Sequence, residues 1–249
     1  YQRRSVNPSE EIIMLGQAPF AVASLMLINF ALTLIFFFRS VRYSEAGRSS
    51  SLRFTVFFVV FLWVLLQAVL SYIGFYTQFS ALPPRLILTG VGPAVIAVLV
   101  FLIIPSLRNI INGFRLEDLI LLSVVRIPVE IMLHQLFTVG LVPEDMTYTG
   151  LNWDIFSGIT APAMMWVAKK NFTWSRSVLI VWHVLTLGLL INIVSIAILS
   201  APFPFQQINF DQPNIAVFSF PFVFLPTFIV PMVLWATLTG LVKIYNVKK

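Results

Sequence analysis

Apolar residues gather in seven long stretches, which short polar loops separate. A helix needs about 20 apolar residues to cross the hydrocarbon of a bilayer, because each residue advances it by about 1.5 Å. The pattern therefore predicts an all-α fold: a polytopic membrane bundle of seven transmembrane helices, in one domain over residues 1–249. The predicted spans are approximately 18–38, 54–76, 86–105, 119–141, 155–168, 178–199 and 217–242.

The prolines of the fifth and the last of these spans affect the prediction. The fifth span is the shortest and contains Pro162. The last span contains Pro221, Pro226 and Pro231, so we expect it to be kinked or to begin late. Carbonyl groups that lose their helical partner should then be hydrogen-bonded by neighbouring helices.

Lysine and arginine are divided unequally between the two sides of the predicted bundle. Twelve lie in loops on one side and three on the other, and Arg126, inside a span, is the sixteenth. Because insertion resists translocation of positive charge, the richer side should be cytoplasmic, which places the N-terminus outside and the C-terminus in the cytoplasm. Omitting the fifth span would put Arg176 outside, so we keep it. The richer side carries Arg39, Arg42, Arg48, Arg53, Arg108, Arg115, Lys169, Lys170, Arg176, Lys243, Lys248 and Lys249, and the other carries Arg3, Arg4 and Arg85.

Composition supports a membrane protein. The chain is 59% hydrophobic and 10% charged, whereas roughly a quarter of the residues in soluble domains are charged. The net charge of +6 follows from the basic loops, so the expected partner is the lipid bilayer and not nucleic acid. The absence of cysteine excludes disulfides and thiolate metal sites. Whether residues precede Tyr1 stays open.

The fourth span carries the strongest functional signal. Arg126, Glu130 and His134 recur at intervals of four and fall within a stripe of roughly 80° on one helix face. Glu130 should lie about 16 Å from the inner boundary, near the middle of the bilayer. Charged groups at this depth normally face the bundle interior, pair with one another and mark a pathway or binding site. The alternative is an Arg126–Glu130 pair that only fixes helix packing.

Several other polar residues could face this stripe and complete a binding site. Each of them alone is typical of hydrogen bonding between helices. The candidates are Asn152 and Asp154 at the outer rim, His183 in the sixth span, and Asn29, Gln67, Tyr72 and Asn192.

Neither a metal nor a bound cofactor is expected. His134 and His183 should lie about 22 Å and 8 Å from the inner boundary, so they cannot readily ligate one haem iron. A third protein ligand for zinc beside His134 and Glu130 is not evident. A retinal Schiff base is also excluded, because Lys243 lies at the cytoplasmic end of the last span.

The second half of the chain resembles an uncharacterised family of multi-pass proteins from Bacteroidetes-type bacteria. The residues that carry the resemblance are RIPVEIMLHQLF from Arg126, GLNWDIFSGITAP from Gly150, LGLLINIV from Leu187 and APFPFQQINFDQPNIA from Ala201. The family has no assigned activity. The resemblance therefore implies location in a bacterial inner membrane and assigns no catalytic residue.

Three functions fit the sequence. The first is binding of a small solute or proton for transport or sensing, with Arg126 holding an anionic group while Glu130 and His134 exchange protons. The second is a non-catalytic subunit of a larger membrane assembly, which the lack of a recognisable catalytic set favours. The third is an intramembrane enzyme acting on lipid, favoured only by the acids Asp145 and Asp154, with Glu144, on the outer side.

Overall fold

The computed structural model describes residues 19–44, 47, 49–105, 108–170 and 172–246, and every regular element within these ranges is helical. The predicted all-α class is confirmed. The α-helices are α2 (Phe20–Tyr43), α3 (Ser50–Tyr72), α4 (Gly92–Ile103), α5 (Arg108–Gly113), α6 (Leu116–Leu121), α7 (Arg126–Thr138), α8 (Ile155–Lys170), α9 (Ser175–Leu199) and α10 (Val230–Asn246). Short 3₁₀ or π-helical turns are η2 (Phe75–Thr77), η3 (Ile87–Val91), η5 (Leu122–Val125), η6 (Glu144–Met146), η7 (Ala216–Phe218) and η8 (Leu225–Ile229).

Five helices in the described part of the chain are long and apolar enough to cross a membrane. They are Phe20–Tyr43, Ser50–Tyr72, Leu116–Thr138, Ser175–Leu199 and Leu225–Asn246. The other two predicted spans correspond to the shorter helices Ile87–Ile103 and Ile155–Lys170. Seven crossings and the orientation stay predictions, because the structure establishes only the length and composition of these helices. The loop charges Arg3, Arg4, Arg48, Lys248 and Lys249 lie outside the described residues.

The last long helix begins at residue 225 and not at the predicted residue 217, which confirms the expectation of a late start. A 3₁₀ turn and irregular backbone precede it, because the ring of Pro221 or Pro226 would clash with the preceding turn inside a regular helix. The second long helix covers residues 50–72 in place of the predicted span 54–76. It ends at Tyr72, where Gly74 follows with a positive φ of 71° that favours glycine.

Proline also explains how α3 is fastened to the bundle. Pro231 has no N–H to donate to the Thr227 carbonyl, and the Trp63 indole of α3 donates to that carbonyl instead, at 3.0 Å. The Gln67 side chain, one turn further along α3, donates at 3.2 Å to the Thr89 carbonyl, which Pro93 cannot engage. The expectation that neighbouring helices bond the carbonyls freed in the last span is therefore confirmed at Thr227, and the same arrangement recurs at Thr89, where it was not expected.

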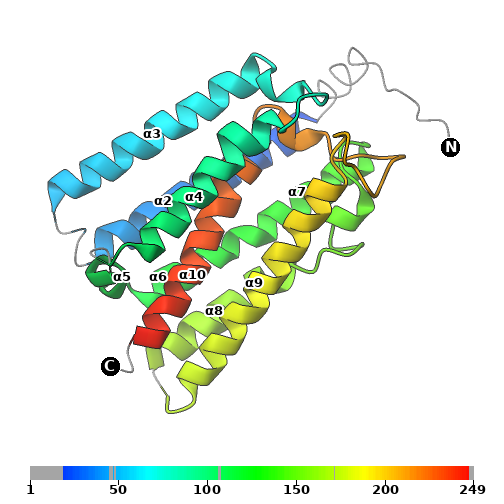
Figure 1. Ribbon diagram of the computed structural model, residues 1–249. Coiled ribbons are helices and arrows are strands. Elements are labelled where there is room, and N and C mark those ends of the chain that lie inside the picture. The colour runs from blue at the N-terminus through cyan, green and yellow to red at the C-terminus, as the bar shows by residue number, and fades with distance from the viewer. Residues whose placement is uncertain (1–18, 45–46, 48, 106–107, 171, 247–249) are drawn as a thin grey trace.

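The long helices lie side by side, with α10 between α4 and α9 and with α3 at the edge of the bundle (Figure 1). In the most apolar window of Leu116–Thr138 and of Leu225–Asn246, 61% of the residues are buried, against 11% for Ser50–Tyr72. The helix that carries the polar stripe is therefore central, and α3 is peripheral.

Two loops close one end of the bundle, where Figure 1 shows them together. Helix α7 ends at Thr138, and the first loop covers residues 139–154. Gly140 in this loop has a φ of 81°, which allows the Leu141 N–H to bond the Leu136 carbonyl at 3.0 Å. The segment 200–215 then covers this end. Its Gln212 side chain donates to the Phe137 carbonyl at 3.0 Å, and its Asn214 side chain donates to the Ala197 carbonyl at 3.1 Å.

Candidate functional site

The polar stripe of the fourth span lies inside the bundle. Helices α6 and α7 form one continuous rod through the 3₁₀ turn η5, and Arg126 is the first residue after that turn. Arg126 is 2% exposed and Glu130 is 1% exposed. Each residue rises about 1.5 Å, so Glu130 lies about 12 Å from the end of α7 at Thr138.

Arg126 pairs with Asp154 and not with Glu130, which corrects the expectation of an ion pair within one helix. One of its terminal nitrogens, Nη1, contacts Asp154 Oδ1 and also donates to the Thr186 carbonyl of α9 at 3.1 Å. Arg126 therefore joins α7 to the start of α8 and to α9. Spacing of four residues permits a contact on a helix surface, but an acid on a neighbouring helix competes for the same guanidinium.

Asn152 connects the two acids of the site. Its Nδ2 donates to Glu130 Oε1 at 2.5 Å and to the Met146 carbonyl at 3.0 Å. Its Oδ1 accepts a hydrogen bond from the Asp154 backbone N–H at 3.1 Å. The Ser157 hydroxyl donates to Asp154 Oδ1 at 3.1 Å. The segment from Asn152 to Ser157 thus orients Asp154 toward Arg126 and holds one oxygen of Glu130.

A close helix contact places this segment beside Arg126. A Cβ added at Gly158 would lie 2.7 Å from Ile127 Cγ1 and 3.2 Å from the Ser123 carbonyl oxygen. Only glycine therefore allows α8 to approach the rod formed by α6 and α7 at this level. The sequence gives no sign of this contact, although Gly158 belongs to a motif that carried the family resemblance.

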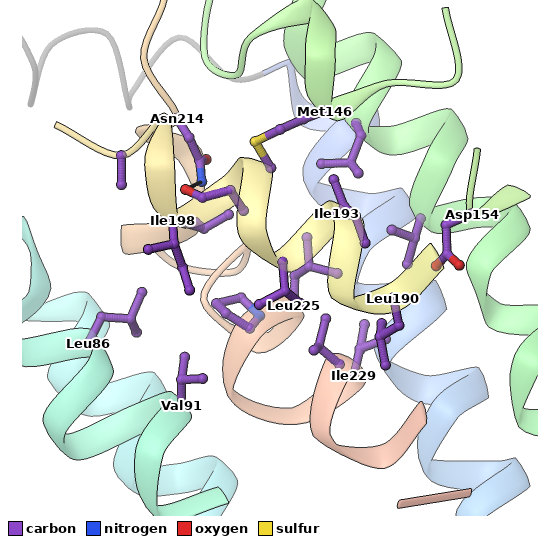
Figure 2. Close-up of a pocket in the computed structure, with 18 of the residues that line it drawn as sticks. Leu86, Val91, Met146, Asp154, Leu190, Ile193, Ile198, Asn214, Leu225 and Ile229 are labelled. Carbon is purple, nitrogen blue, oxygen red and sulfur yellow. Dashed lines mark hydrogen bonds between the residues drawn. The ribbon is translucent and has the colours of Figure 1, made fainter. Parts of the chain in front are cut away.

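A cavity of about 160 Å³ ends on the charged residues. Arg126, Glu130 and Asp154 line one end of it, and almost all of its remaining wall is apolar. Figure 2 shows Asp154 at one side of the α9 segment and Leu86 with Val91 across the cavity at the other. The apolar residues labelled there between the two sides are Leu190, Ile193, Ile198, Leu225 and Ile229.

The cavity is closed at the end of the bundle where the two loops lie, and it is partly open at its side. Met146, Phe203 and Asn214, all from the two loops that close the bundle end, line it there. Ile198 of α9 also lines it and is 38% exposed. Ile87 and Val91 of η3 line it as well and are half-buried, so the opening lies where α9 faces η3.

Three polar atoms of the charged residues have no hydrogen-bond partner in the protein. They are Arg126 Nε, Arg126 Nη2 and Glu130 Oε2, and all three are buried. Leaving a buried donor or acceptor unpaired costs about 1–3 kcal/mol, and more where the group is charged. Eight other buried polar atoms of the described residues also lack a partner, but these three belong to charged side chains that line the cavity, where a ligand with complementary groups can reach them.

The other predicted site residues take different positions. Asn152 and Asp154 join Arg126 and Glu130, but neither His134 nor His183 lines the cavity. The His134 ring packs against Tyr148 at a centroid distance of 4.8 Å. His183 Nδ1 lies 2.7 Å from the Leu179 carbonyl oxygen, and its ring lies against Gly240.

The remaining polar candidates do not line the cavity. Asn192 donates to the Leu151 carbonyl at 2.9 Å, and Gln67 belongs to the attachment of α3. Tyr72 is 85% exposed. Asn29 is fully buried but does not line the cavity. Within the described residues, no group of three or more histidine or acidic side chains could hold a metal ion.

The fold is thus all-α, with helices that can cross a membrane and a buried site built from Arg126, Glu130, Asn152 and Asp154. The chain belongs to the family described as a domain of unknown function, DUF8737, which it matches over residues 83–245. All four site residues lie inside the matched region. No curated protein and no solved structure matches the chain.

Proposed function

We propose that this protein binds a small molecule at the charged end of the cavity, and that Glu130 exchanges a proton there as part of transport or sensing. The observation that carries the proposal is that Arg126 and Glu130 line the cavity while three of their polar atoms lack a partner. Buried polar atoms in a folded protein normally have at least one hydrogen-bond partner. Buried ionisable groups at such depth are expected to mark a binding site or pathway.

The charges in the site favour a proton over an anion. Arg126 is paired with Asp154, so the site holds two acids, Asp154 and Glu130, and only one base. An uncompensated charge in an apolar interior is strongly unfavourable, and a proton on Glu130 removes it. This differs from the expectation that Arg126 holds an anionic group, because its charge is already balanced within the protein.

The protein is proposed to cross the membrane seven times. Helices Ile87–Ile103 and Ile155–Lys170 then complete the set, with the N-terminus outside and the C-terminus in the cytoplasm. The family resemblance adds location in a bacterial inner membrane. A reporter active only in the cytoplasm should work when fused after Lys249 and fail when inserted in the 200–215 loop. Activity from that loop would refute the seven-span topology.

Binding is tested by extracting the full chain with its native lipid and identifying every retained small molecule by mass spectrometry. Ala197→Leu adds bulk inside the cavity, since Ala197 lines it. Gly188→Leu introduces the same side chain on the same helix, where a new Cβ meets no atom within 4 Å. A molecule retained by the wild type and Gly188→Leu, and lost in Ala197→Leu, supports the proposal. Equal retention in all three, or no retained molecule, contradicts it.

Proton exchange by Glu130 has a separate test. Infrared spectra of the reconstituted protein, taken across a pH titration, report protonated carboxyl groups. One carboxyl band should titrate in the wild type and disappear in Glu130→Gln. A spectrum unchanged by this substitution would show that Glu130 does not exchange protons.

A second candidate function, as a non-catalytic subunit of a membrane assembly, is favoured by α3. Only Gln67 and Ser71 of its 23 residues are buried. A helix so weakly packed has a broad face for a partner helix. Native mass spectrometry of the complex in lipid tests this, and a monomer with no copurifying protein would exclude it.

A further inference from the structure

The geometry points to a specific ligand class: we infer that the cavity binds a neutral, hydroxyl-bearing apolar molecule that reaches it from the bilayer, with the hydroxyl placed between Arg126 and Glu130. This inference rests on the proposed function and deepens it by naming the ligand. Three features of the cavity support it.

The first feature is the pattern of unpaired atoms. Arg126 Nε and Nη2 are donors, and Glu130 Oε2 is an oxygen that no protein donor reaches. Both side chains are more than nine-tenths buried and line the cavity. A hydroxyl group accepts from one side and donates to the other, so a single group can satisfy both residues.

The second feature is charge. A carboxylate ligand would add another negative charge to a site that already holds two acids and one base. An ammonium ligand would lie next to the Arg126 guanidinium. A neutral head group adds no charge to a region where an extra buried charge is strongly unfavourable.

The third feature is the shape of the apolar part. The cavity volume of about 160 Å³ is close to that of engineered apolar cavities that hold one benzene molecule. The opening beside Ile198 is bordered by apolar residues, including Leu86 and Val91 across the cavity. A ring or short chain therefore fills the cavity, and a longer substituent can extend through the opening into lipid.

The test uses ring-sized fluorinated probes and fluorine NMR on the full chain in nanodiscs. The matched probes are 4-fluorophenol, which donates and accepts, 4-fluoroanisole, which only accepts, and 4-fluorobenzoate, which is an anion. Above the pH at which Glu130 loses its proton, its unpaired oxygen can only accept; because an unmatched buried acceptor is poorly tolerated, the phenol should then bind at least about tenfold more tightly than the anisole. Saturable binding should disappear in Ala197→Leu and persist in Gly188→Leu.

Glu130→Gln tests whether Glu130 accepts the hydrogen bond from the ligand hydroxyl. Glutamine presents an NH₂ donor where glutamate has the second oxygen. The preference for phenol over anisole should therefore fall to about twofold or less, while the anisole still binds. A preference unchanged in Glu130→Gln would overturn the assignment of the hydroxyl to Glu130.

The source of the ligand is tested with a longer probe. In a competition experiment, 4-octylphenol should displace 4-fluorophenol if the cavity opens to lipid beside Ile198. If 4-octylphenol does not displace it, the ligand is a small water-soluble molecule, and the inference that it comes from the bilayer is overturned. Tighter binding of 4-fluorobenzoate, or no saturable probe binding, would overturn the ligand class. In either case, a native molecule lost only in Ala197→Leu would leave the proposed function standing.

Discussion

The pairing of Arg126 with Asp154 predicts a strong energetic coupling between these two residues. Both side chains are buried, with 3% and 7% of their surface exposed. Removing one charge strands the other, at a cost of about 3–5 kcal/mol. Arg126→Met also removes the bond to the Thr186 carbonyl, which adds about 1 kcal/mol. Arg126→Met should therefore destabilise the protein more than Asp154→Asn does.

The assay is a double-mutant cycle on reversible unfolding in mixed micelles. The combined variant Arg126→Met with Asp154→Asn should be less destabilised than the sum of the single effects, by about 2–4 kcal/mol. A parallel cycle with Glu130→Gln is the control, because glutamine keeps the oxygen that Asn152 bonds. Its coupling to Arg126 should stay below about 1 kcal/mol, as expected for side chains without a direct bond. Equal coupling in both cycles, or strict additivity with Asp154→Asn, would refute the pairing.

Three further predictions concern packing and the site. Gly158→Ala should lower stability by about 1–3 kcal/mol in thermal unfolding because its Cβ collides with the α6–α7 rod, whereas Gly188→Ala, in open space, should be neutral or stabilising. Trp63→Phe should cost about 1 kcal/mol and speed hydrogen exchange in α3 selectively, because the Thr227 carbonyl loses its donor. Asn152→Asp should lower the unfolding temperature at neutral pH and less so in acid, because a proton shared with Glu130 relieves the repulsion of two adjacent carboxyl groups.

Sequence patterns predict the helices well because membrane spans are specified by length and hydropathy. The stripe residues Arg126 and Glu130 were expected inside the bundle on grounds of solvation alone, and the structure buries both. The late start of the last helix was also predictable, since proline restricts backbone wherever it occurs. These features depend on local sequence only.

The partner of Arg126 could not be predicted in this way. Asp154 follows it by 28 positions, and the two meet only because Gly158 lets α8 approach closely. The misplaced expectation for His134 has a similar cause. The stripe continues along the helix, but at His134 the neighbouring surface is Tyr148 and not the cavity. Contacts between helices depend on packing geometry, which helix periodicity does not contain.

The two hydrogen bonds that attach α3 to the bundle also bear on how the chain assembles during synthesis. Gln67 can find the Thr89 carbonyl as soon as α4 has been inserted, but the Thr227 carbonyl that Trp63 requires belongs to the start of the final helix. Helix α3 therefore enters the bilayer early and becomes fully anchored last. A ribosome-bound chain that stops before residue 227 should hold α3 by the Gln67 bond but not by the Trp63 bond, so the outermost helix is fully attached only after residue 227 has been made.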